Sequence, residues 1–280
     1  MKKSLRRWGW LFTGPTVAAF IIGFIVPFAL GVYLSFTEFR TVTRSEWVGL
    51  DNYVALFSDA TFLHSLWYTA AFAIVTTIII NVAAFAIAYL LVKTFRGRNL
   101  FRSVFFMPNL IGGIVLGYIW LLLLNGVLGM WARSITYDAS YGFWGMVILM
   151  CWQQIGYMMV IYIAGLQSIP SELIEAAEMD GASRARSLRS VIIPLVMPSI
   201  TVCTFLTITN GFKMFDQNLA LTNGAPARES ELLALNIFNT FYGRAGFEGV
   251  GQAKAVIFLI IVAIIALVQN RYARSKESIS

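Results

Sequence analysis

The sequence predicts an all-α integral membrane protein whose chain crosses the membrane six times. Hydrophobic residues make up 58% of the 280 residues and charged residues only 12%, whereas a soluble domain has roughly 25% charged residues. The mean hydropathy is +0.73. Because so few charged side chains could not cover the surface of a soluble protein, lipid must surround much of the chain.

Six segments are apolar enough to cross a bilayer, which requires roughly 20 residues of helix. They cover residues 11–36, 68–92, 103–124, 143–166, 192–212 and 255–269. Prolines interrupt the third and fifth segments, and such breaks are tolerated where neighbouring helices satisfy the freed backbone groups. The first apolar run is too long for the core of a cleaved signal peptide. We therefore expect one membrane domain over residues 11–270, with terminal segments 1–10 and 271–280.

The distribution of basic residues predicts the orientation of the chain. Fourteen of the 21 Lys and Arg residues fall on one side of the predicted spans: Lys2, Lys3, Arg6, Arg7, Lys93, Arg96, Arg98, Arg102, Arg184, Arg186, Arg189, Arg271, Arg274 and Lys276. Cytoplasmic loops are enriched in Lys and Arg, so both termini are expected in the cytoplasm. The net charge of +7 is then a topology signal, and no nucleic-acid partner is expected.

Few residues could support chemistry of the chain's own. Cys151 and Cys203 lie in apolar runs and His64 is the only histidine, so we expect no disulfide framework, metal site or catalytic triad. Apart from Lys213 and Asp216, charged residues are expected in loops, which argues against a membrane enzyme. The spans also lack the ion-coupling carboxylates and inverted repeats of a secondary carrier.

The loop at residues 168–191 has an unusual composition for a connector. Ser171, after Pro170, could cap a short helix, residues 173–179 favour helix, and Asp180-Gly181 predicts a break before a second short helix at 182–189. Small residues in this loop would let a partner approach closely. These residues alone leave two alternatives open, a docking surface and an interfacial loop that merely joins two spans.

The sequence of this loop resembles a known motif. Residues 175–182 read Glu-Ala-Ala-Glu-Met-Asp-Gly-Ala, with Pro194 and Pro198 following, and this pattern resembles the EAA loop of ABC importer permeases, in particular the carbohydrate-uptake branch. Residues 48–53 look like the family's first outer loop, and residues 221–226 resemble the loop after its fifth span. Leu188 and Ala225 depart from the family's common pattern, in which an aromatic residue and a second glycine stand there.

The resemblance implies an ABC importer type I permease fold, located in the inner membrane of a bacterium or archaeon. It implies that the EAA loop docks onto an ABC ATPase through Glu175, Ala176, Ala177, Asp180 and Gly181. The chain has no Gly-x-x-x-x-Gly-Lys-Ser/Thr phosphate-binding loop, so no cofactor is expected here, and ATP and Mg²⁺ are expected on the partner. The implied partners are a second related permease, two ATPase copies, an extracytoplasmic solute-binding protein and a carbohydrate substrate.

Seven residues in or directly after the fourth and fifth spans, most of them polar, are candidates for the substrate pathway: Gln153, Gln154, Tyr157, Thr207, Asn210, Lys213 and Met214. Aromatic rings can stack on a sugar and amides can bind its hydroxyl groups. Hydrogen bonding between helices is the alternative role of such residues. We expect a sugar or oligosaccharide. The alternative is glycerol 3-phosphate or another polar solute, although only one cation, Lys213, is near.

Overall fold

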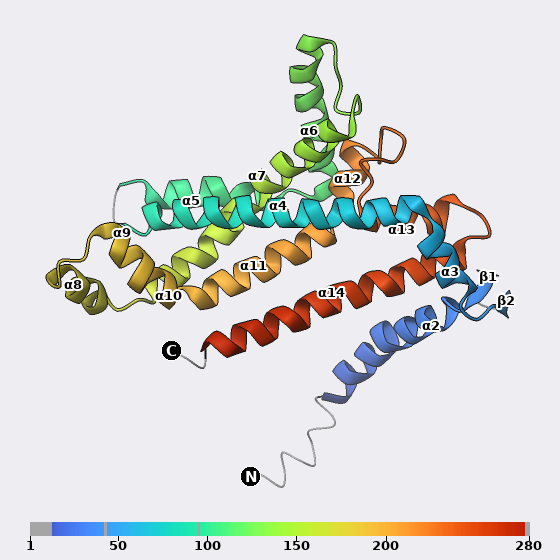
Figure 1. The fold of residues 1–280 in the computed structure, drawn as a ribbon, viewed down its shortest axis with the longest axis horizontal. Coiled ribbons are helices and arrows are strands. Elements are labelled where there is room, and N and C mark those ends of the chain that lie inside the picture. Colours follow the sequence, from blue (N-terminus) through green and yellow to red (C-terminus); the bar gives the residue numbers. More distant parts are fainter. Residues whose placement is uncertain (1–12, 42–43, 94–95, 278–280) are drawn as a thin grey trace, which may run out of the picture. The chain divides into compact units, whose positions relative to one another are not determined.

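The structure is a computed structural model that describes residues 13–41, 44–93 and 96–277, and its regular elements are almost all helices (Figure 1). Five helices in this part of the chain are long and apolar enough to cross a membrane, or six if one bent pair counts as a single span. The predicted all-α integral membrane class is therefore confirmed. The predicted terminal segment 1–10 lies outside the described residues.

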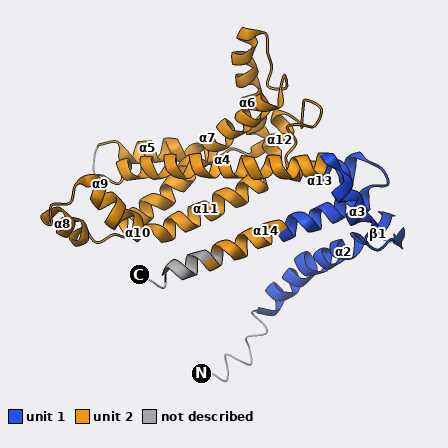
Figure 2. Ribbon diagram, in the orientation of Figure 1, with its two compact units in different colours: residues 1–60, 237–260 blue, residues 61–236, 261–280 orange. Residues whose placement is uncertain are grey.

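The chain forms two compact units (Figure 2). Unit 1 contains residues 1–60 and 237–260, and unit 2 contains residues 61–236 and 261–280. The helices α13 (Leu233–Gly243) and α14 (Glu248–Glu277) contribute to both. The expectation of one membrane domain over residues 11–270 stays a prediction.

Unit 1 begins with the first predicted span, a helix at Thr13–Leu34. It includes a π-helical stretch, η1 (Ile21–Ile25), and the α2 segment (Val26–Leu34). A two-stranded antiparallel hairpin follows, β1 (Thr37–Thr41) and β2 (Arg44–Trp47), and then the short helix α3 (Asp51–Ser58).

Asn52 ties these elements together. Its Nδ2 donates to the carbonyl oxygen of Ser35 at 3.0 Å and to that of Thr37 at 2.9 Å. A Cβ at Gly249 of α14 would collide with the Thr37 carbonyl oxygen and approach the Asn52 amide, so glycine allows α14 to approach the hairpin closely. Asn52 belongs to the segment that resembles the family's first outer loop, and its contacts give it a structural role there.

The sixth predicted span, 255–269, begins too late. The apolar helix starts at Glu248, and Lys254 is fully buried inside it. Lys254 Nζ lies 2.7 Å from Asp59 Oδ2 and donates to Thr240 Oγ1 at 2.9 Å. The expectation that charge is confined to loops, Lys213 and Asp216 apart, is therefore wrong, because a carboxylate from another element satisfies this ammonium group.

Unit 2 is built around three long helices, α4 (Ala60–Leu91), α7 (Ala139–Gln167) and α11 (Met197–Phe212). Its hydrophobic core contains buried side chains from all three, among them Phe72, Ile80, Met158, Tyr162 and Cys203. The second and fourth spans are confirmed. The second starts at Ala60, eight residues before the predicted 68–92, and the polar Ser65 is accommodated in the added stretch because its hydroxyl donates to the Phe62 carbonyl oxygen.

The third predicted span, 103–124, is wrong in its position. The chain there forms α5 (Arg98–Phe106) and a 3₁₀ turn, η2 (Met107–Leu110), before α6 (Gly113–Leu128) begins; a further 3₁₀ turn, η3 (Gly129–Trp131), follows α6. Gly112 has an extended backbone, with ψ of 142°, so the chain changes direction before α6. The apolar helix that can cross the membrane is Gly113–Trp131.

The fifth span, predicted at 192–212, is bent. Residues Arg184–Leu195 and Met197–Phe212 form two helical segments at 70° to each other. The first comprises α9 (Arg184–Ser187), the π-helical η4 (Leu188–Ile192) and α10 (Ile193–Leu195). Pro194 and Pro198 flank the bend and cannot donate the hydrogen bonds that a continuous helix requires.

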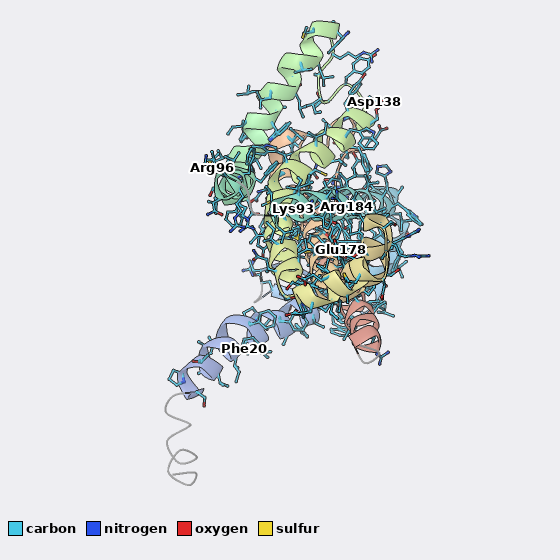
Figure 3. All side chains as sticks on the ribbon, turned by 90° about the vertical axis from the view of Figure 1, so that its left-hand side faces the viewer. Phe20, Lys93, Arg96, Asp138, Glu178 and Arg184 are labelled. Atoms are coloured by element: carbon cyan, nitrogen blue, oxygen red, sulfur yellow. The ribbon has the colours of Figure 1, made fainter. Side chains whose placement is uncertain are left out.

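Two basic connections lie at one end of unit 2 (Figure 1). In the view from that end, Lys93 and Arg96 of the α4–α5 connection and Arg184 of α9 all lie on the side turned toward the viewer (Figure 3). The Arg102 guanidinium also donates to the Leu91 carbonyl oxygen at the end of α4, at 3.1 Å. The two loops thus share a side, as the charge distribution predicts. The cytoplasmic location of the termini stays a prediction.

Candidate functional site

The first candidate site is the loop between α7 and α9, which contains α8 (Ser171–Met179). No residue of α8 is buried in this chain. Ser171 is not the cap that we expected: the capping position is Pro170, and no side chain caps the helix. Glu172 lies in the first turn, where a negative charge is favourable beside the positive end of the helix dipole. At α9, Ser183 does cap, with its Oγ accepting from the Arg186 N–H at 3.4 Å.

Gly181 ends α8 in a Schellman motif, a common C-terminal cap. The Ala182 N–H donates to the Ala177 carbonyl oxygen at 3.0 Å, and the Gly181 N–H donates to that of Glu178, also at 3.0 Å. Gly181 has φ of +74°, in the left-handed region that only glycine adopts without strain. The helix, glycine turn and second short helix predicted from the sequence are therefore present.

Most residues of α8 and of the glycine turn that follows it are exposed. Glu175, Ala176, Glu178, Asp180 and Gly181 are exposed, and Ala177 is half-buried. The end of the helix projects an apolar side chain, with Met179 89% exposed. No heavy atom outside the turn lies within 4 Å of where a Gly181 side chain would stand. This end of unit 2 thus presents a short helix with a glycine cap, which lies at the front in Figure 3 near the labelled Glu178.

The second candidate site is a pocket of about 200 Å³ in unit 2. Five of the seven residues predicted for the substrate pathway line it: Gln153, Gln154, Asn210, Lys213 and Met214. Met150 and Gln217 complete the lining. Residues from the fourth and fifth predicted spans therefore line the same pocket, and this proximity could not be predicted from the sequence.

Amide groups form the polar wall of this pocket. Gln217 Nε2 donates to Gln153 Oε1 at 3.0 Å, and Asn210 Nδ2 donates to Gln154 Oε1 at 3.0 Å. Gln153 Nε2 also reaches the Ile111 carbonyl oxygen at 3.4 Å. Among the described residues, Lys213 has no carboxylate within ion-pair distance. The wall thus offers amide donors and acceptors together with one exposed ammonium group.

The pocket lies where a helix is interrupted. The α11 helix ends at Phe212 and the short helix α12 (Asp216–Leu221) begins four residues later. Lys213 and Met214 lie in the break, while Asn210 and Gln217 lie on either side of it. Interrupted membrane helices expose polar backbone and side-chain groups at depths where water is scarce, and transporters commonly place solute sites there.

Two predicted pathway residues lie outside the pocket. Thr207 is fully buried, and its hydroxyl accepts from Asn81 Nδ2 at 2.9 Å. The hydroxyl of Tyr162 donates to the other end of that amide at 2.6 Å. These contacts join α4, α7 and α11. Thr207 therefore takes part in hydrogen bonding between helices, which is the alternative to a role in the substrate pathway. The Tyr157 ring lies 6.4 Å from that of Phe106. A pathway role for Thr207 and Tyr157 stays a prediction.

Gln217 is the residue that sequence reasoning missed. It follows the fifth predicted span, 192–212, and is not among the residues expected to line the substrate pathway. One signal was available, because Gln217 is four residues after Lys213 and would share its face in a continuous helix. The helix is not continuous there, so only the structure shows that both residues line the pocket. No group of three or more His, Cys, Asp or Glu side chains within the described ranges could hold a metal ion.

Comparisons with known proteins agree with this architecture. The sequence model of the family described as "Binding-protein-dependent transport system inner membrane component" matches residues 91–277. The chain is 42% identical, over 96% of its length and 95% of the relative's, to the "Probable starch degradation products transport system permease protein AmyD" of Thermoanaerobacterium thermosulfurigenes. It is 29% identical, over 94% and 93%, to the sn-glycerol-3-phosphate transport system permease protein UgpA of Brucella abortus.

A solved structure shares the fold. It is a chain from a bacterial ABC transporter involved in the import of the acidic polysaccharide alginate, with a TM-score of 0.81, 98% coverage of both chains and 18% sequence identity. At that identity the likeness concerns the fold alone.

Proposed function

From the premise that this chain belongs to the family of inner-membrane components of binding-protein-dependent transport systems, we propose that it is the permease subunit of an ATP-driven importer of a sugar or oligosaccharide. One observation carries the proposal. Within unit 2, a polar pocket at a helix break is combined with an exposed, glycine-capped helix at the end that carries the basic loops. An importer needs both features, one to pass the solute and one to receive energy.

We place the energy input at α8. Its exposed residues Glu175, Ala176, Asp180 and Gly181, with half-buried Ala177, form a surface that a cytoplasmic ABC ATPase can cover. Small side chains permit a close approach, and the exposed Met179 side chain would be shielded from water in such a complex. ATP and Mg²⁺ would bind to that partner, because this chain has no phosphate-binding loop.

The pocket supports a hydroxylated cargo. Each hydroxyl group of a sugar can donate one hydrogen bond and accept others, and the amides of Gln154, Asn210 and Gln217 offer both functions. The name of the 42%-identical relative refers to starch degradation products, which are neutral glucose oligomers. At about 200 Å³ the pocket is smaller than the roughly 300 Å³ or more of typical ligand sites. We infer that a second permease subunit completes the passage.

A second candidate cargo is glycerol 3-phosphate. The observation that favours it is Lys213, whose exposed ammonium group lines the pocket and could pair with a phosphate. UgpA, at 29% identity, is a glycerol-3-phosphate permease by name. We rank it second because Lys213 is the only cationic residue in the pocket lining.

The proposed complex contains this chain, a second related permease, two ATPase copies and an extracytoplasmic solute-binding protein. Both termini of this chain would lie in the cytoplasm, since that orientation puts α8 and the basic loops on the ATPase side. Closure of the ATPase dimer would move α8 and open the pocket outward, and ATP hydrolysis would return it inward.

Reconstitution of the whole complex in proteoliposomes tests this function. We expect ATP-dependent uptake of maltotriose, a trimer of glucose, and no uptake when the ATPase subunit is omitted. Uptake of sn-glycerol 3-phosphate in place of maltotriose would support the second cargo. Solute accumulation without the ATPase would contradict the assignment of a permease subunit that depends on a separate ATPase.

A further inference from the structure

The short helix α12 is seated on α6 by two glycines four residues apart. A Cβ at Gly113 would lie 2.7 Å from Asp216 Cβ and 3.1 Å from Gln217 Cδ, and one at Gly117 would lie 2.6 Å from Ala220 Cβ. A Gly-x-x-x-Gly spacing in a membrane helix lets another helix approach at backbone distance. Because Gly113 and Gly117 have no side chains, α12 can pack closely on α6. This packing sets the position of Gln217 at the pocket.

Two neighbouring amides on α12 have different surroundings. Asn218 is fully buried, and its amide is fully engaged: Nδ2 donates to the Ser230 carbonyl oxygen at 2.9 Å, and Oδ1 accepts from the Leu232 N–H at 2.9 Å. Asn218 thus holds the following loop. Gln217 is half-buried and lines the pocket, and the hydrogen bond to Gln153 is its single side-chain contact of that kind among the described residues.

The hydrogen bond between Gln217 and Gln153 leaves groups available to a ligand. It occupies one of the two Gln217 Nε2 hydrogens and leaves Gln217 Oε1 as an acceptor at the pocket. In the neighbouring pair, the hydrogen bond from Asn210 Nδ2 to Gln154 Oε1 likewise leaves Gln154 Nε2 as a donor and Asn210 Oδ1 as an acceptor. The lining therefore retains both acceptors and donors, which suits hydroxyl groups, each of which donates and accepts.

We propose that Gln217 is a solute-contacting residue that determines specificity, and that Gly113 and Gly117 position it. The inference rests on the proposed function and extends it to a residue on a third element, α12. A sugar hydroxyl in the pocket would take the place of the hydrogen bond between Gln217 and Gln153, and both amides would then bind the solute. The recognised chemistry is a vicinal diol, as in a hexose ring.

Uptake of modified sugars by the whole complex tests the inference. Wild-type and Gln217→Ala complexes are compared for ATP-driven uptake of maltotriose and of its monodeoxy analogues, each lacking one hydroxyl. The binding protein is identical in both, so any change in the uptake ratios belongs to the permease. We expect the preference for maltotriose over at least one analogue to fall about tenfold, because a site built for a hydroxyl rejects the analogue lacking it.

Gln269→Ala is the matched control. Gln269 also makes one amide hydrogen bond, to the Thr201 carbonyl oxygen at 3.3 Å, but does not line this pocket. Its uptake ratios should equal the wild-type ratios. Ratios left unchanged by Gln217→Ala for every analogue would overturn the inference while the proposed function stands. If the wild-type complex takes up neither maltotriose nor its analogues, the proposed sugar cargo is wrong and the inference falls with it.

A labelling experiment covers the case in which Gln217→Ala fails to fold. The native cysteines, Cys151 and Cys203, are buried, so a new thiol can be followed alone. Labelling of Gln217→Cys by a small water-soluble thiol reagent should slow several-fold when maltotriose is added to the complex with its binding protein and ATP. Asn223→Cys, exposed and outside the pocket, should label at an unchanged rate. Equal labelling of Gln217→Cys with and without maltotriose would contradict contact.

Discussion

Lys254 and Asp59 lie 195 positions apart in the sequence, and their charged atoms lie 2.7 Å apart in unit 1. The lysine side chain has no exposed surface, and that of Asp59 is 19% exposed. An ammonium group buried at this depth is stable only while a carboxylate and a hydroxyl satisfy it. The contact fixes the beginning of α14 against the junction of α3 and α4.

Replacement of Asp59 alone should therefore be severe. Asp59→Ala leaves the Lys254 ammonium buried without its carboxylate, and removal of one partner of a buried pair costs roughly 3–5 kcal/mol. The free energy of unfolding in detergent, measured by denaturant titration, checks the value. Lys213→Met is the control: that lysine is exposed, so its loss should change stability by less than about 0.5 kcal/mol. A similar small effect for Asp59→Ala would show that water reaches Lys254.

Gly181→Val should uncouple ATP hydrolysis from uptake. Valine in the left-handed region costs roughly 1–2 kcal/mol, so the chain will leave the φ of +74° and re-aim the end of α8. We expect normal amounts of protein in the membrane, loss of ATP-driven uptake and weakened co-purification of the ATPase.

Gly246→Val is the matched control for that substitution. Gly246 has φ of +85°, and its side chain would also stand in open space, so the strain is comparable but lies between α13 and α14. Uptake should survive in this variant. Full uptake with normal ATPase co-purification in Gly181→Val would contradict the docking role of α8.

Gly156→Ala should be destabilising, whereas Gly126→Ala should not. A Cβ at Gly156 of α7 would collide with the backbone carbonyl oxygen of Phe105, whereas one at Gly126 of α6 meets nothing within 4 Å. Gly156→Ala must push α5 away from α7 and should lower stability by about 1–3 kcal/mol. Gly126→Ala should be neutral or stabilising by up to ~1 kcal/mol. Thermal unfolding of both variants measures the difference, and equal midpoints would refute the close packing.

The amide of Asn81 should couple energetically to Thr207. Asn81→Leu removes the hydrogen bonds to Thr207 and Tyr162 and should destabilise unit 2 by about 1–2 kcal/mol, since buried partners are left unsatisfied. Thr207→Val should add little once Asn81 is gone. A double-mutant cycle on unfolding free energies gives the coupling. Strictly additive effects would mean that the two side chains do not interact, which would contradict the interhelical role of Thr207.

The sequence predicts local features well where neighbouring residues decide them. The short helix α8 and its glycine turn follow from helix-forming residues ended by Asp180-Gly181, and the clustering of the two basic loops follows from the placement of Lys and Arg. The exact limits of the spans are less predictable. Hydropathy places the third span too early because it carries no information about the change of direction at Gly112. It excludes Lys254 from the sixth helix because a lysine counts as charged, whereas the carboxylate that satisfies it is remote in sequence.

Composition, hydropathy and charge placement determined by themselves that this protein is helical, lies in the membrane and presents its most unusual loop beside its basic residues. These properties are sums over many residues and tolerate local error. Only the tertiary structure decided that Gln153, Gln154 and Asn210 share a pocket with Gln217, and that Thr207 does not. Pocket membership depends on where α11 breaks and how closely α12 packs on α6, and both are set by contacts between residues far apart in the chain.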